Sequence, residues 1–181
     1  MKMRKRLERL VSRTLCFFVV GMFVTLTAGF QSVAVADPVP TPDPGITDKT
    51  IVVIPNHAKY KVVGVPGTHK APFGSGDGCP LQSTVKSFWP VSTVITLKKG
   101  FTLPPGAHNL RVQLSIDNDA EIFINGTSIG VVTHGFCPLV DEFLIISPDP
   151  LLLVGPNVLK VVATDLGGES FIDLRVLVDL P

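Results

Sequence analysis

Apolar and polar residues alternate most cleanly in the middle of the chain. Every second residue is apolar over 112–116 and again over 120–124, with a polar break between the two runs. A period of two residues is typical of a β-strand with one face buried. Asn125-Gly126 follows, and this dipeptide favours a two-residue hairpin turn because both residues tolerate positive φ. The pattern therefore predicts a hairpin whose second strand begins with the apolar run 129–132.

The rest of the chain after residue 49 repeats such segments. Short apolar or alternating runs separated by Pro, Gly and Asn predict further strands at 50–54, 60–65, 85–89, 91–97, 101–103, 142–146, 158–164 and 170–180. After the N-terminal region, no segment of ten or more residues has the apolar spacing of an amphipathic helix. We therefore predict an all-β fold, an antiparallel β-sandwich or jelly roll, as a single domain over residues 50–181.

The first 36 residues have the composition of a signal peptide. Six basic residues lie between 2 and 13, an apolar run of 16 residues follows at 15–30, and Ala34-Val35-Ala36 supplies the small residues that signal peptidase reads. The alternative is an uncleaved anchor helix, which needs about 20 apolar residues. We expect cleavage before Asp37 and a secreted bacterial protein, extracellular or in the cell envelope, with no membrane span. Residues 37–49, rich in Pro, are expected to form a linker or N-terminal arm.

Removal of this leader changes the charge balance. The leader holds six of the 16 basic residues and one of the 15 acidic residues, so 10 basic and 14 acidic residues remain, a net charge of −4. A protein of that sign has no electrostatic reason to bind nucleic acid or anionic lipid. This leaves other extracellular molecules as the partners to expect, such as a carbohydrate or a protein.

Two cysteines, Cys79 and Cys137, lie beyond the leader. An even number of cysteines in an exported chain predicts a disulfide, which would bring the loops at 74–80 and 134–140 together. The alternative is a metal site with His134 and Cys137 as ligands, which would need further ligands from elsewhere in the chain.

No sequence motif indicates catalysis. The chain lacks the G-x-S-x-G motif of serine hydrolases, and its histidines show no zinc-enzyme spacing. We therefore expect a protein that is not an enzyme and requires no cofactor. A structural Ca²⁺ is a conditional expectation, with Asp117, Asp119 and Asp165 as ligands. The prediction that comes before it is that Asp117 to Asp119 forms a tight turn, which recruits the same residue types.

Two stretches resemble the galactose-binding-like jelly roll, found in sugar-binding domains of large glycosidases and in appended domains of bacterial secreted proteins. They are FTLPPGAHNLRVQLSIDNDAEIFINGTSIG at 101–130 and LLLVGPNVLKVVATDLGGESFIDLRVLV at 151–178. The resemblance implies a β-sandwich that binds a sugar, a lipid, a protein or nothing. The chain departs from it in aromatic content, since it has one Trp, Trp89, and one Tyr, Tyr60, both before the matching stretches.

The function that we predict is a non-catalytic binding module, carbohydrate-binding or adhesive. The expected binding residues are those of the disulfide-linked loops and the aromatic residues that precede them: Phe73, Trp89, His134, Phe136 and Asp141. The alternative is a structural or protein-interaction domain of an extracellular or envelope assembly. Exposed Trp89 and Tyr60 would favour the first function, and an exposed apolar patch would favour the second.

Overall fold

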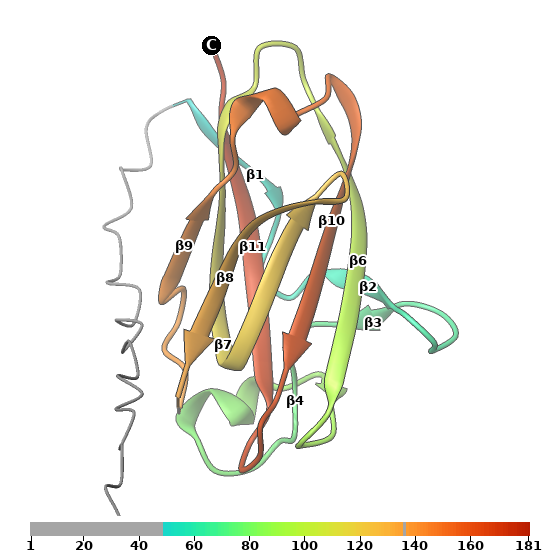
Figure 1. Ribbon diagram of the computed structural model, residues 1–181, viewed down its shortest axis with the longest axis vertical. Coiled ribbons are helices and arrows are strands. Elements are labelled where there is room, and N and C mark those ends of the chain that lie inside the picture. The colour runs from blue at the N-terminus through green and yellow to red at the C-terminus, as the bar shows by residue number, and fades with distance from the viewer. Residues whose placement is uncertain (1–48, 136) are drawn as a thin grey trace, which may run out of the picture. The chain divides into compact units, whose positions relative to one another are not determined.

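The computed structural model describes residues 49–135 and 137–181 (Figure 1). The predicted signal peptide, most of the predicted arm and Phe136 lie outside the described residues. The elements of the described part are β1 (Thr50–Ile54), β2 (Lys59–Val62), β3 (His69–Lys70), β4 (Phe73–Gly74), η1 (Pro80–Thr84), β5 (Ser87–Phe88), β6 (Val94–Leu103), β7 (His108–Ile124), β8 (Thr127–His134), β9 (Phe143–Ile146), η2 (Asp149–Leu151), β10 (Gly155–Thr164) and β11 (Phe171–Asp179).

The predicted all-β fold is confirmed. The only helices in the described ranges are the short 3₁₀ helices η1 and η2, and no helix there is long and apolar enough to cross a membrane. All strand pairs are antiparallel except β4 with β5. In one layer of the sandwich, β11 lies between β7 on one side and β1 and β4 on the other, and β9 pairs with β7.

The other layer has the strand order β2, β6, β10, β7 and β8, with β3 beside β2. In Figure 1 the strands β6 and β10 lie in front of β11. Strand β7 belongs to both layers because its first half pairs with β11 and its second half with β10. The core fills the space between the layers with alternate side chains of the long strands, among them Val112, Leu114, Ile122, Val161 and Val176, none of which is exposed.

The Asn125-Gly126 hairpin is also present. Both residues have positive φ, and they connect β7 to β8. The side chain of Asn125 is held as well: Nδ2 donates to the Leu151 carbonyl at 2.9 Å, and Oδ1 accepts from the Val158 N–H at 2.9 Å. This turn therefore also fixes the segment that leads into β10.

Three expectations about the strands were wrong. The predicted turn at Asp117–Asp119 is absent, because β7 continues through these residues from one layer into the other. The predicted strands at 91–97 and 101–103 are one strand, β6, since Gly100 pairs with Val158 and the ladder is unbroken. The strand predicted at 158–164 begins earlier, because Gly155 and Pro156 are already part of β10. In each case, hydrogen bonds to a neighbouring strand outweigh the local turn preference.

Candidate functional site

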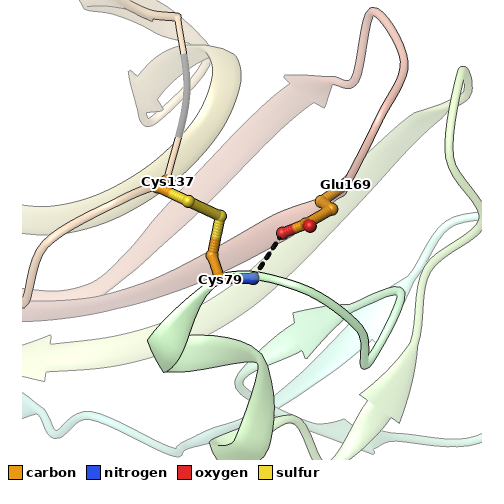
Figure 2. A group of neighbouring side chains, drawn as sticks. All are labelled: Cys79, Cys137 and Glu169. Carbon is orange, nitrogen blue, oxygen red and sulfur yellow. Dashed lines mark hydrogen bonds between the residues drawn. A yellow bond between two sulfur atoms is a disulfide. The ribbon is translucent and has the colours of Figure 1, made fainter.

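The predicted disulfide between Cys79 and Cys137 is confirmed, with the two Cα atoms 5.2 Å apart. Figure 2 shows the carboxylate of Glu169 beside it, where Oε2 accepts a hydrogen bond from the Cys79 N–H at 2.7 Å. Gly78 makes room for this carboxylate, since a Cβ atom on Gly78 would lie 1.3 Å from Glu169 Oε1. The disulfide and Glu169 together fix the start of η1. We call this group the Cys79 clamp.

The clamp is the first of several contacts that hold the segment 79–93. The buried side chain of Gln82 donates to the Ser170 carbonyl at 2.9 Å and accepts from the Gly76 N–H at 3.0 Å. The Ser170 hydroxyl donates to the Trp89 carbonyl, and the Trp89 N–H donates to the Gly74 carbonyl at 2.9 Å. These bonds anchor β5 to β4 and to the start of β11.

Phe88 is the exposed aromatic residue that this anchored segment presents. Its relative exposure is 73%, whereas the next residue, Trp89, is 1% exposed. Successive side chains of an extended segment point to opposite faces, so the burial of Trp89 directs Phe88 outward. The Trp89 indole is fixed by a hydrogen bond from Nε1 to Thr93 Oγ1 at 3.0 Å.

Two hollows adjoin Phe88, with volumes of about 310 and 340 Å³. Phe88, Val62, Val65 and Ile95 line both of them. One is completed by Val63, Trp89, Pro90, Thr93, Val94 and Thr96, and the other by His69, Phe73, Lys86 and Ser87. We call the two hollows together the Phe88 groove. Each lies at the lower end of the size range of small-molecule sites.

The aromatic residues that the sequence analysis considered for ligand binding are too deeply buried to stack on a ligand. Phe73 and Trp89 line the groove, but each is only 1% exposed. Tyr60 is also buried, and its ring packs edge-on against Phe73 with the centroids 6.2 Å apart. Burial raises the pKa of the Tyr60 hydroxyl. None of these three rings offers a face to a ligand in this structure.

The predicted residues of the second loop have structural partners. His134 Nε2 lies 3.7 Å from Glu142 Oε2, and the imidazole packs edge-on against Phe143. Asp141 forms an ion pair with Arg175 at 3.0 Å. Phe136, the other residue predicted here, lies outside the described residues. His134 and Asp141 therefore join the loop to β9 and β11 and do not line the Phe88 groove.

The predicted calcium ligands lie near the Cys79 clamp, around the point where β7 changes layers. Burial raises the pKa of Asp117 to about 6; the charge of Asp165 adds to this, and a hydrogen bond from the Cys137 N–H opposes it. Asp165 accepts hydrogen bonds from the N–H groups of Ser92 and Gly167. Among the described residues, the one group of three metal-type donors within 4.8 Å of one another is Cys79, Cys137 and Glu169. Its sulfurs form the disulfide, and the calcium site stays a prediction.

A smaller polar pocket lies on the outer side of the other layer. His57 Nε2 is 3.3 Å from Asp173 Oδ2, and Ser115 lies opposite Asp173 on the neighbouring strand. Burial raises the pKa of Asp173. The pocket has a volume of about 90 Å³, well below the size of typical ligand sites. Since the Ser115 hydroxyl accepts from the Asp141 N–H at 2.9 Å, this group ties loops to the sheet.

Sequence reasoning missed Phe88. The signal was present in the pair Phe88-Trp89, because two adjacent aromatic residues in a strand cannot both face the core. The sequence did not indicate which of the two would be buried. That choice depends on Thr93 and Ser170, which bind the indole and the carbonyl of Trp89 from other parts of the fold.

Comparison with solved structures finds the same fold within much larger proteins. A β-glucuronidase of an uncultured Clostridium species matches 78% of this chain and 31% of its own, with 13% identity and a TM-score of 0.51. A β-glucuronidase from Ruminococcus gnavus matches 77% of this chain and 31% of its own, with 12% identity and a TM-score of 0.52. No protein-family pattern and no curated protein matches the sequence. The likeness establishes a fold that occurs as one part of glycosidases.

Proposed function

We propose that this protein is a non-catalytic carbohydrate-binding domain of the galactose-binding-like kind, exported from a bacterial cell. The observation that carries the proposal is the Phe88 groove, where one exposed aromatic ring stands between two hollows. Aromatic faces are suited to pack against the apolar C–H face of a sugar ring. The similarity of the fold to one part of two β-glucuronidases supports the proposal.

The rigidity of the groove supports the same function. Weak ligands such as sugars bind better to a surface whose side chains are already ordered, because less conformational entropy is lost on binding. Here the Cys79 clamp, Gln82 and Ser170 fix the backbone on both sides of Phe88. The groove is therefore preorganised for its ligand.

A protein-interaction domain is the second candidate, and a specific observation favours it. Large apolar residues are exposed together around the groove: Val63, Val65, Phe88, Val91 and Val94. Such a patch is typical of a surface that binds another protein. The two functions differ in what they require of Phe88, since a sugar needs an aromatic face whereas a protein interface tolerates an aliphatic side chain of similar size.

The test is a glycan-array screen of the purified chain, followed by calorimetry with each glycan that binds. We expect Phe88→Leu to weaken binding about tenfold, since ring stacking is lost while apolar area is largely kept. Val154→Ala is the control, because Val154 is 71% exposed and lines neither hollow. Undiminished binding in Phe88→Leu would exclude stacking. No binding on the array would contradict the carbohydrate function and favour the protein-interaction domain.

A further inference from the structure

Positive charge is concentrated on one part of the sandwich. Strands β2, β3, β6 and β10 carry no Asp or Glu. They carry six lysines: Lys59, Lys61, Lys70, Lys98, Lys99 and Lys160. None of the six forms an ion pair with a carboxylate in the described ranges. This distribution contrasts with the net charge of −4 that remains without the leader.

Three of these lysines form a row on the outer face of the sheet. In the strand register, Lys98 of β6 is paired with Lys61 of β2 on one side and with Lys160 of β10 on the other. Their neighbours along the strands, Tyr60, Leu97 and Leu159, are buried, so the alternation directs the three lysines outward. We call Lys61, Lys98 and Lys160 the lysine row.

The sheet face around the row is open. Lys61 and Lys98 are exposed and Lys160 is half-buried. In Figure 1 the strands β6 and β10 lie on the near side, and only the β7–β8 hairpin crosses the upper end of β10. Lys160 Nζ lies 3.4 Å from the ring centroid of Phe123 on β7, which positions this ammonium group without neutralising it.

Without a bound ligand, the lysine row is expected to lower the stability of the folded protein. Like charges directly opposite each other on neighbouring strands repel. Here three lysines occupy paired positions on adjacent strands, and their backbones span two interstrand spacings, about 10 Å in all. An anionic ligand would offset this repulsion, and no described protein carboxylate does so.

The row is continuous with the Phe88 groove. Thr96 lines the groove and lies two residues from Lys98 on β6, so the side chains of Thr96 and Lys98 share the outer face of the sheet. Lys86 and His69 line the groove on its other side. A ligand several sugar units long would therefore meet an aromatic ring and ammonium groups on one continuous surface.

We propose that the bound carbohydrate is an anionic polysaccharide, carrying carboxylate or sulfate groups, and that the lysine row binds these groups. The inference rests on the proposed carbohydrate function and specifies its ligand class. A row of three lysines on adjacent strands suits a repeating anionic polymer better than a single small anion.

The test measures binding of the full chain to polygalacturonate and to chondroitin sulfate at 50 and 500 mM NaCl. Fully methyl-esterified pectin is the neutral counterpart of polygalacturonate, and poly-L-glutamate is a polyanion without sugar. We expect binding to either anionic glycan, weakened by salt. The triple variant Lys61→Gln, Lys98→Gln, Lys160→Gln should bind about tenfold more weakly, since exposed ion pairs contribute a few-fold each.

Lys49→Gln is the control for the loss of one positive charge outside these strands, because Lys49 lies just before β1, and it is compared with each single lysine variant of the row as well as with the triple variant. The thermal unfolding of each variant verifies that it is folded. Esterified pectin could bind as tightly as polygalacturonate, with this binding lost in Phe88→Leu but kept in the triple variant. That result would overturn the anionic inference and leave the carbohydrate function standing. Equal binding of poly-L-glutamate would overturn the inference for glycans. Binding to no glycan would overturn both proposals.

Discussion

At the level of single residues, the fold changes the pKa of Asp117. Its side chain is almost fully buried where β7 passes between the layers, and Asp165 places a second carboxylate nearby. Burial and this like charge raise the pKa of Asp117 to about 6, above the value of about 4 for an unfolded chain. Between these two pH values the folded protein binds more protons than the unfolded one, so its stability decreases as the pH rises.

The variant Asp117→Asn removes this effect, because an amide of the same shape carries no charge. We expect it to be about 3 kcal/mol more stable than wild type at pH 8 and nearly equal at pH 4, since the pKa is shifted by about two units and each unit corresponds to about 1.4 kcal/mol. Urea unfolding at the two pH values measures the difference. The control Asp77→Asn changes an exposed carboxylate in the neighbouring loop. A variant as pH-dependent as wild type would contradict the assignment to Asp117.

A second buried residue, Arg111, forms an ion pair that connects three strands. Arg111 is fully buried, and its guanidinium donates to both carboxylate oxygens of Asp179, at 2.7 and 2.9 Å. These hydrogen bonds lower the pKa of Asp179. Asp179 also accepts from Thr50 and Asn109, so one carboxylate joins β1, β7 and β11. A bidentate pair of this kind holds the ends of three strands in a fixed geometry.

Among the elements, η1 and β5 depend on the Cys79 clamp. Closing a loop of 58 residues stabilises the fold by about 4 kcal/mol in the chain-entropy model. The contact with Glu169 adds a local constraint, because this carboxylate occupies the space beside Gly78. The same clamp holds the segment that presents Phe88, which links the disulfide to the proposed binding surface.

Two glycines in this loop provide a matched test of that contact. Gly76 and Gly78 both have φ near 90°, so alanine is strained at either position, but only Gly78 faces Glu169. We expect Gly76→Ala to cost about 1 kcal/mol and Gly78→Ala about 1 kcal/mol more, measured by chemical denaturation, because the Glu169 side chain must turn away and lose its hydrogen bond from the Cys79 N–H. Adding Glu169→Ala to Gly78→Ala should recover part of the loss. Equal costs at the two glycines would show that Glu169 does not constrain the loop.

For the whole molecule, alternation along the chain was enough to predict the all-β class and the 125–126 hairpin, and the number of cysteines was enough to predict the disulfide. These features depend on neighbouring residues or on a count of cysteines. The path of β7 could not be predicted, because Asp117 to Asp119 favour a turn locally and only the pairing with β10 and β11 keeps them extended. Phe88 and the lysine row were missed for a related reason, since the residues that bury Trp89 and align Lys61 with Lys160 are distant in sequence.

The lysine row also predicts a conflict between stability and binding. Lys98 is paired with a lysine on each of its two neighbouring strands, whereas the described register pairs Lys61 with one lysine, Lys98. We expect Lys98→Thr to stabilise the protein by about 0.5 kcal/mol at low salt, and Lys61→Thr by about half as much, because each removes like-charge repulsion and threonine suits a strand. The gain should shrink at 0.5 M NaCl, where surface charges are screened.

Urea unfolding at low and high salt measures these gains, and Lys160→Thr provides the contrast. Like Lys61→Thr, that variant relieves repulsion from one neighbouring lysine, but it also removes the cation–π contact with Phe123, so its net effect on stability should be smaller than that of Lys61→Thr. If Lys98→Thr were destabilising at low salt, the three ammonium groups would not repel one another as the register implies. If Lys98→Thr stabilises the protein and also weakens binding to an anionic glycan, then the charge of Lys98 destabilises the free protein and contributes to ligand binding.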